Sequence, residues 1–469
     1  MPSGLHSVKQ DLVYFVHGDQ VGISAFAHAA SDDTHRHASF VAVGILVSQG
    51  HGLAGQAWLH ATELRRLARL LVDEGSDSRH LEVFWRRHAQ SSVDGKAEPQ
   101  PRGGNSEQGL TSDHPAIDMV ALLDTFGPLI FPLYRASLLR KRILLMGSPP
   151  VQRNCNFVYA LSVLSTTPTA LDEVLPRDAE RLFRTRPLYS VGIPDIPLMS
   201  QEAKSGWVAT TTDDILGDKH ALYDVVVNLS PLLNGSTRQW PSVSSSEGTV
   251  IKATQRDLRR YRILRQELFR LRYARAQGMN EDDENDNDES ELIRNSSNAP
   301  PKADTDRNDP AATTESVSWN ALAYNTYMKW GSSDEILAWE EEEVTTDRQL
   351  LAGSSETYDT VSHTSGLEED EVSIVEAQAV ATLLTAYFHR LTTLTMQTLA
   401  DAQAEADDEG EAETDEDLIV IRADHLRTMG LDIWSTADMQ FVAEATQLYF
   451  GRGTIAEDNG FSMCGLRVC

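Results

Sequence analysis

Acidic side chains are concentrated in one part of this 469-residue chain. Residues 281–417 contain 36 Asp and Glu residues but only 6 Lys and Arg residues. Runs such as NEDDENDNDESE, which starts at residue 280, have too few apolar side chains to offset the entropy lost when a chain becomes ordered. We therefore expect a folded protein that is interrupted by a disordered acidic insertion over 279–370 and by an acidic linker over 401–417.

Charge outside this region is balanced, and the balance limits the kind of partner. The remainder has 35 basic and 34 acidic residues, whereas nucleic-acid binding needs clustered Lys and Arg, so we expect no nucleic-acid partner. The three cysteines, Cys155, Cys464 and Cys469, are too few for a disulfide framework and favour a reducing, cytoplasmic compartment. We expect no signal peptide, because the N-terminus has no basic region followed by an apolar run. We expect no transmembrane segment, because charged residues and prolines interrupt the most apolar stretch, Met119–Leu139.

Short apolar runs alternate with amphipathic stretches in the first 90 residues, which predicts an α/β lobe over 1–90. The expected elements are a β-hairpin at Leu12–Val16 and Gly22–Ala27, a strand buried on both faces at Phe40–Ser48, and a helix at Ala57–Leu71. Residues 91–112 are rich in Gly, Pro, Gln and Ser and predict a linker.

A second α/β lobe is predicted over 113–278. Its expected strands are Arg142–Met146, Gly206–Thr211 and Tyr223–Leu229, and its expected helices are 116–124, 133–139 and 152–165. The long connections between these strands predict a mostly parallel or mixed sheet. The lobe ends in a strongly basic helix, Arg256–Gln277, which contains eight Arg and one apolar stripe.

Ordered structure is expected to resume after the acidic insertion. The aromatic residues of Trp319–Trp330 and Glu335–Trp339 favour a short docking element within the insertion. Residues 371–400 have the pattern of a helix, and 418–469 predict a C-terminal helical lobe and tail. Within that lobe we expect helices at Arg422–Met429 and Ser435–Phe450, the second with Ser435 as its N-cap.

One motif favours an enzyme. Gly50–Gly55 matches GxGxxG between a predicted strand and a predicted helix, as in a dinucleotide site. Arg86 and Arg87 follow the next strand-like run, Leu81–Trp85, where they could meet the 2′-phosphate of NADP. Because no acidic ribose-binding residue follows that run, we favour a glycine-rich turn without a nucleotide and keep an NADP-dependent oxidoreductase as a remote alternative. No His, Cys or acidic residues have the spacing of metal ligands, so neither a metal nor a cofactor is expected.

Several segments together resemble a known family, the LCHN-type branch of the DENN-domain proteins. They are PSGLHSVKQDLVYFVHGDQVGISAF (2–26), FGPLIFPLYRASLLRKRILLM (126–146), RPLYSVGIPDIPL (186–198), GWVATTTDDILGDKHALYDVVVNL (206–229), and LDIWSTADMQFVAEATQLYFGR (431–452) through CGLRVC. The resemblance implies a longin-like N-terminal lobe, a central α/β lobe and a C-terminal helical lobe. In this family β structure precedes the opening segment, so we expect the first one or two longin strands to be missing here.

The resemblance also implies a function. DENN modules bind Rab-family small GTPases in membrane traffic and often promote release of their GDP. Such an exchange factor acts by differential binding and needs no catalytic side chain or cofactor. The alternative is a DENN-like adaptor that binds a GTPase or a membrane without exchange activity. We place the GTPase-binding residues in a groove between the first two lobes, with core or capping roles as the alternative, at Tyr134, Arg135, Lys141, Arg142, Asp213 and Asp214.

The basic helix has two interpretations. Its arginines could face an anionic membrane, which would make the protein peripheral on intracellular membranes, or they could face the acidic segments or solvent. The residues placed at the membrane are Arg256, Arg259, Arg260 and Arg262. If the acidic insertion covers this helix and inhibits the module, deletion of 281–370 should raise membrane or GTPase binding. Acylation of Cys464 or Cys469 stays open, as does the oligomeric state.

Overall fold

The structure is a computed structural model. It describes residues 2, 4–30, 38–48, 54–73, 78–93, 110–176, 183–202, 205–229, 240–278, 313–318, 322, 333–351, 369–409, 418–456, 462–463 and 466–467. Several expectations fall outside these residues: most of the 91–112 linker, Gly50–Leu53, the acidic run that begins at residue 280, nearly all of Trp319–Trp330, and the two C-terminal cysteines.

One eight-stranded sheet joins the first two predicted lobes, in the order β3-β2-β1-β5-β6-β4-β7-β8. The strands are β1 (Gln10–His17), β2 (Gln20–Ala30), β3 (Ala38–Ser48), β4 (Ile143–Met146), β5 (Arg186–Ser190), β6 (Trp207–Thr211), β7 (Val225–Asn228) and β8 (Ser242–Ser245). Strands β5, β6, β4 and β7 are parallel to one another, and the other neighbours are antiparallel. The predicted mixed sheet is confirmed, and the pairing of Phe15 in β1 with Tyr189 in β5 makes it continuous between the lobes.

The N-terminal lobe contains the predicted hairpin, in which β1 pairs with β2 over their full overlap. The short helix η1 (Leu5–Ser7) precedes it, and the predicted helix is present as η4 (Ala57–His60) and α1 (Ala61–Asp73). Two expectations are wrong. Leu81–Trp85 belongs to a helix, α2 (Arg79–Val93), whose Phe84 and His88 rings pack on His60. Strand β3 is an edge strand among the described residues, and alternate residues along it, including Phe40 and Leu46, are exposed, so it is not buried on both faces.

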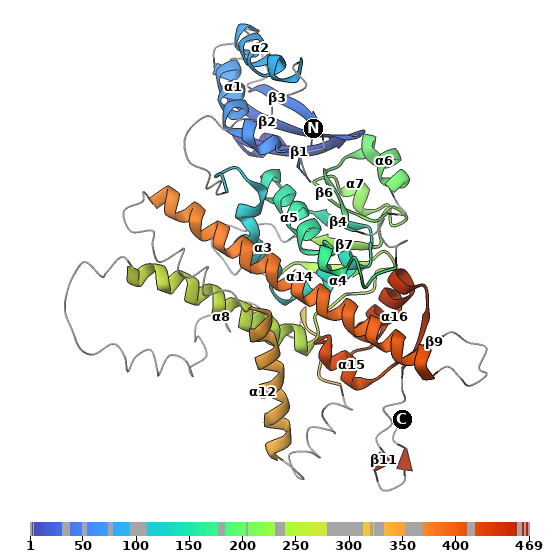
Figure 1. Ribbon diagram of the computed structural model, residues 1–469. Coiled ribbons are helices and arrows are strands. Elements are labelled where there is room, and N and C mark those ends of the chain that lie inside the picture. The colour runs from blue at the N-terminus through green and yellow to red at the C-terminus, as the bar shows by residue number, and fades with distance from the viewer. Residues whose placement is uncertain are drawn as a thin grey trace, which may run out of the picture.

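Helices cover both faces of the central strands (Figure 1). They are η5 (Pro115–Asp118), α3 (Met119–Phe126), η6 (Gly127–Leu129), α4 (Ile130–Leu138), α5 (Val151–Leu164), η7 (Thr169–Leu171), η9 (Ile193–Asp195), α6 (Ile196–Gln201) and α7 (Asp214–Gly217). Helices α6 and α7 enclose a small core around Trp207, and α5 packs on β1, β5 and β6. The stretch Pro115–Leu138 is long and apolar enough to cross a bilayer, but most of it is buried, as in the core helix of a folded domain.

The rest of the chain is mainly helical. Its elements are α8 (Gln255–Gly278), α12 (Ser333–Leu350), α14 (Glu369–Glu409), β9 (Leu418–Ile421), α15 (Ala423–Thr428), α16 (Thr436–Phe450), β10 (Gly453–Ala456), β11 (Ser462–Met463) and β12 (Leu466–Arg467). Helices α15 and α16 confirm the predicted pair, and the Ser435 hydroxyl accepts a hydrogen bond from the backbone N–H of Asp438 as an N-cap. Helix α12 lies within the predicted 279–370 insertion and includes Glu335–Trp339, where the aromatic residues favoured a docking element. Helix α14 likewise continues into the predicted 401–417 linker.

The C-terminal helices share a core with the central lobe. Figure 1 shows α14 as a long helix that crosses that lobe. The Tyr134 ring on α4 lies 4.9 Å from the Phe388 ring on α14, and its hydroxyl is 2.6 Å from Oγ1 of Thr392. The Tyr449 hydroxyl on α16 donates to the carbonyl of Leu138 at 2.8 Å. Because these contacts are buried, the two regions are expected to unfold together.

Candidate functional site

The carboxyl ends of the parallel strands form one edge of the central sheet. At this edge β5 is followed by η9, and β6 is followed by Asp213 and α7. The Asp213 carboxylate accepts a hydrogen bond from the N–H of Ile215 and caps α7, while Asp214 is exposed. Ile193 and Ile215, which sequence reasoning missed, are 45% and 53% exposed. This edge therefore presents apolar side chains beside carboxylates; the only sequence signal was an isoleucine within each polar turn.

The N-terminal lobe meets the central lobe at this same edge. The buried Asp11 carboxylate of β1 accepts hydrogen bonds from the backbone N–H groups of Val151 (2.6 Å) and Gln152 (3.2 Å), at the start of α5. Burial raises the pKa of Asp11, and these backbone hydrogen bonds oppose the rise. A carboxylate at a helix N-terminus also interacts favourably with the helix dipole. These hydrogen bonds therefore join the N-terminal lobe to the central lobe at the turn between β4 and α5.

Tyr134 and Arg135 lie inside the protein and away from this edge. Tyr134 packs on α14, and the Arg135 guanidinium lies between Asp257 of α8 and Asp438 of α16. This placement corrects the expectation that the two residues contact a GTPase, because a surface partner cannot reach them without opening the core. The spacing of the apolar residues around Tyr134 in the sequence already favoured a role for this residue in core packing. The partners of Arg135 are too far along the chain to be recognised from the sequence.

Lys141 and Arg142 lie at the opposite edge of the sheet, where β4 begins. The Lys141 ammonium pairs with Glu444 of α16 at 2.5 Å. The Arg142 guanidinium donates to both carboxylate oxygens of Asp224, at 2.6 and 3.1 Å. Since β4 and β6 are parallel, this edge is one strand length from Asp213, which follows the end of β6. The six predicted residues therefore do not form one site, and only Asp213 and Asp214 lie at the carboxyl edge.

Two buried carboxylates share the Arg135 guanidinium. Asp257 accepts from it at 2.8 and 2.6 Å, and Asp438 lies 3.3 Å from it. Burial raises the pKa of Asp438 to about 7; the neighbouring charge of Asp257 adds to the rise, and Arg135 opposes it. One arginine cannot balance two buried anions, so near neutral pH Asp438 is partly protonated.

This network predicts a pH dependence of stability. The pKa of Asp438 is 3.8 for an ordinary aspartate and about 7 in the fold, so between these values the folded state binds more protons. The free energy of unfolding should therefore fall as pH rises from about 4 to about 7. Urea unfolding of the wild type and of Asp438→Asn would measure this fall. It should be smaller in the variant, whereas an equal fall in both proteins would contradict the assignment. Asp432 and Glu315 also have pKa values that burial raises. Both residues are present in the wild type and in the variant, so they do not account for a difference between the two proteins.

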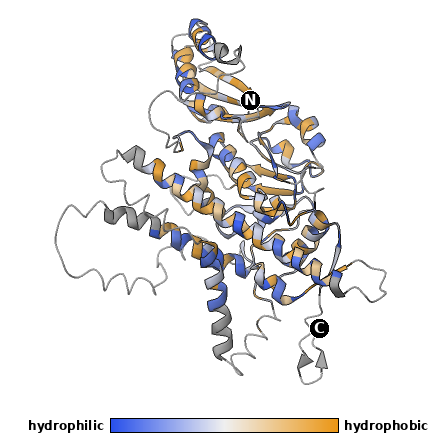
Figure 2. Cartoon of the chain, in the orientation of Figure 1, coloured by the Kyte–Doolittle hydropathy of each residue, from blue (hydrophilic) through white to orange (hydrophobic). Residues whose placement is uncertain are grey.

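The basic helix α8 is covered by α12. Arg256 and Arg260 are only 2% and 1% exposed, and both bind the buried carboxylate of Asp347, at 2.7 and 2.9 Å. Arg259 binds Glu343 at 2.9 Å. Figure 2 shows that both helices are hydrophilic where α12 meets α8. The structure corrects the expected membrane contact of Arg256 and Arg260, because both guanidinium groups are buried against an acidic segment. Arg262 is exposed, and the Arg259 side chain, although paired with Glu343, is 41% exposed.

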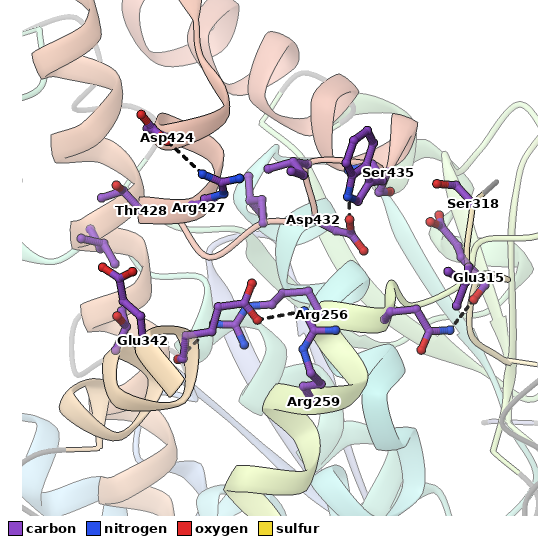
Figure 3. Close-up of a pocket in the computed structure, with 18 of the residues that line it drawn as sticks. Arg256, Arg259, Glu315, Ser318, Glu342, Asp424, Arg427, Thr428, Asp432 and Ser435 are labelled. Atoms are coloured by element: carbon purple, nitrogen blue, oxygen red, sulfur yellow. Dashed lines mark hydrogen bonds and ion pairs between the residues drawn. The ribbon is translucent and has the colours of Figure 1, made fainter. Parts of the chain in front are cut away.

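A polar cleft of about 560 Å³ lies beside this contact, between α8, α12, α15 and residues 313–318 (Figure 3). Arg256, Arg259 and Arg427 line it, and each is paired with a carboxylate. Asp432 and Glu315 also line it, and burial raises the pKa of both. The cleft is therefore lined by ion pairs, of which those of Arg256 and Arg259 join α8 to α12.

The GxGxxG motif is mostly outside the described residues, but its last glycine is described. Gly55 has a φ of +55°, and a Cβ there would lie 2.7 Å from Cγ2 of Val47 and 2.8 Å from the carbonyl oxygen of Ser48. A glycine is therefore required by the turn and its packing. Arg87, predicted to meet a 2′-phosphate, instead donates to Glu63 at 2.8 Å from helix α2. The strand on which the NADP alternative depended is a helix.

Comparison with known proteins finds two family models that match different parts of the chain. A model of the DENN domain-containing protein 11 family matches residues 1–237, half of the chain. A model named domain of unknown function (DUF4484) matches residues 314–419 and 405–469. The second match begins at residue 314 and so includes part of the predicted acidic insertion.

Individual relatives are similar over parts of the chain. DENN domain-containing protein 11 of Rattus norvegicus is 29% identical over 286 residues, 58% of this chain and 58% of that protein. The Xenopus laevis protein of the same name is 30% identical over 238 residues, 49% of this chain and 52% of that protein. An uncharacterized Saccharomyces cerevisiae protein is 34% identical over 146 residues, 29% of this chain and 26% of that protein. The chain thus spans little more than half the length of these two DENN domain-containing protein 11 relatives and about a quarter of the yeast protein. No solved structure matches it.

Proposed function

This chain belongs to the DENN domain-containing protein 11 family, and from this membership we propose that it binds a Rab-family small GTPase and accelerates the release of its GDP. The family match over residues 1–237 supports the proposal, because it covers the N-terminal lobe and most of the central sheet. Rab GTPases act at intracellular membranes, so we place the protein peripherally at such a membrane.

The proposed mechanism is a difference in affinity. An exchange factor that binds the nucleotide-free GTPase more tightly than the GDP-bound form lowers the affinity for GDP by the same factor, because the two binding equilibria are linked. A 100-fold difference corresponds to about 2.7 kcal/mol. This free energy comes from contacts with the GTPase, so the protein needs no nucleophile or general acid of its own.

We propose that the GTPase docks on the carboxyl edge of the parallel strands. The exposed pair of Ile193 and Ile215, beside the acidic Asp213 and Asp214, is the observation that supports this choice. Interfaces of signalling proteins combine an apolar centre with a polar rim. The junction with the N-terminal lobe lies at the same edge, so a docked GTPase could contact both lobes. Of the six residues predicted from the sequence, Asp213 and Asp214 keep their proposed role.

Release of fluorescent GDP from a panel of purified Rab proteins tests the function. Addition of the full chain should accelerate release from one or two members and leave the others unchanged. If no member responds although the chain is folded by circular dichroism, the exchange activity is contradicted. Binding without acceleration, measured by calorimetry with the same panel, would instead identify the adaptor alternative.

A further inference from the structure

The polar cleft beside α8 and α12 is large enough to hold a ligand. Its volume of about 560 Å³ falls within the range of about 300–1,000 Å³ that is common for binding sites. Five acidic residues and three arginines line it, and each arginine is already paired with a carboxylate. The described lining therefore has more negative charge than its own cations balance.

Two of the acidic side chains, Glu315 and Asp432, form no ion pair with a described lysine or arginine. Both residues are half-buried. The Asp432 carboxylate accepts a hydrogen bond from the backbone N–H of Trp434 at 3.0 Å, and the Glu315 carboxylate accepts one from the Ser435 hydroxyl. These neutral donors hold the two carboxylates in place but supply no positive charge.

The two carboxylates lie in the same part of the cleft. Figure 3 shows the Asp432 and Glu315 side chains above Arg256 and Arg259. Burial raises the pKa of Glu315, and the charge of Asp432 adds to the rise, so the two groups are close enough to repel each other. A cation between them would offset this repulsion and pair both charges.

An organic cation fits this place better than a metal ion. Among the described residues, no group of three or more His, Cys, Asp and Glu side chains has the geometry to hold a metal. Apolar side chains also line the cleft, including Leu394, Leu431 and Trp434, and they match the methylene stem of a long basic side chain. A planar guanidinium has five N–H donors that can reach carboxylates on two segments at once, whereas an ammonium is a compact point charge.

We propose that the cleft binds an arginine side chain of a partner polypeptide, with the guanidinium between Glu315 and Asp432. The two carboxylates come from segments that are far apart in the sequence, residues 313–318 and the turn between α15 and α16, so the bound arginine would join them. The cleft is larger than one side chain, and residues that flank the arginine would fill the rest of it. This inference does not depend on the proposed exchange activity.

Calorimetric titration of the full chain with N-acetyl-arginine amide tests the site. This compound should bind with a Kd of about 0.1–1 mM, as expected for a ligand of about 15 non-hydrogen atoms. N-acetyl-citrulline amide is the matched control compound, because its urea group has nearly the same shape and no charge, and it should bind at least about tenfold more weakly. The acidic runs attract any cation, so both titrations are performed at about 0.15 M salt, which screens exposed charges.

Two variants locate the bound compound. Asp432→Asn and Glu315→Gln each remove one charge from the cleft and keep the size of the side chain, and each should weaken binding of the arginine compound at least about tenfold. Since burial already disfavours both charges, each variant should remain folded, which urea unfolding checks. Asp19→Asn removes the same charge from the exposed turn between β1 and β2 and should leave binding unchanged. An absence of binding to the wild type, equal binding of the two compounds, or binding that neither cleft variant weakens would overturn the proposal.

Discussion

Asp347→Ala is expected to lower the free energy of unfolding by about 3–5 kcal/mol. Asp347 is fully buried on α12 and is the carboxylate to which both Arg256 and Arg260 bind. Its removal leaves two guanidinium groups in the interior beside each other. Burial and the neighbouring Arg260 charge lower the pKa of Arg256, and the Asp347 carboxylate opposes this fall. Urea unfolding followed by circular dichroism would measure the loss.

Two further variants separate this effect from a general weakening of α12. Glu342→Ala removes a carboxylate from the same helix, but Glu342 is exposed, so its loss should cost less than about 0.5 kcal/mol. Arg256→Met leaves Asp347 paired with Arg260 and should cost less than Asp347→Ala. If Asp347→Ala is no worse than Glu342→Ala, the buried cluster does not stabilise the fold.

This cluster changes the test of inhibition by the acidic insertion. Deletion of 281–370 would remove Asp347 together with the acidic run, so any change in binding could result from a loosened fold. Deletion of 281–312 removes the run and keeps residues 313–318 and α12. We propose that any masking of the exposed part of α8, including Arg262, comes from this shorter segment. Unchanged binding to anionic vesicles at low salt after the shorter deletion would exclude it.

The sequence predicted those elements whose signal is local. The β1–β2 hairpin and the N-cap Ser435 depend on neighbouring residues, and both are present. Leu81–Trp85 was wrong because a run of five residues has no reliable period to distinguish a helix from a strand. Phe40–Ser48 was assigned the wrong burial for a related reason, since continuous apolar runs are typical of strands buried on both faces.

The positions of the predicted site arginines were harder to predict, because their ion pairs join segments that lie far apart in the sequence. Arg256 and Arg260 meet Asp347 about 90 residues later in the chain, and Arg135 meets Asp257 and Asp438. Each arginine therefore resembled a free surface charge in the sequence, although it is buried. Asp213 and Asp214 were placed correctly at a strand end, because that position follows directly from the strand that precedes them.

Ile215→Arg is expected to reduce the rate of GDP release about 10- to 100-fold, which corresponds to about 1.4–2.8 kcal/mol of lost binding free energy. Ile215 is the most exposed apolar residue at the carboxyl edge, and Asp213 fixes its backbone by capping α7. An apolar residue at the centre of an interface typically contributes this much, and the arginine would also place a larger, charged side chain in the contact. The rate is measured with the Rab protein that responds to the wild type.

The matched control is Val250→Arg. Val250 is 61% exposed, and it lies next to β8, which is the last strand of the sheet on the side away from the N-terminal lobe. Both variants add one positive charge in place of an exposed apolar side chain, so a general electrostatic effect on the GTPase would reduce both rates equally. A selective loss in Ile215→Arg, with unchanged unfolding in urea, supports docking at the carboxyl edge. Equal rates in the two variants would move the GTPase to another surface while leaving the exchange activity intact, because the wild-type assay establishes that activity independently.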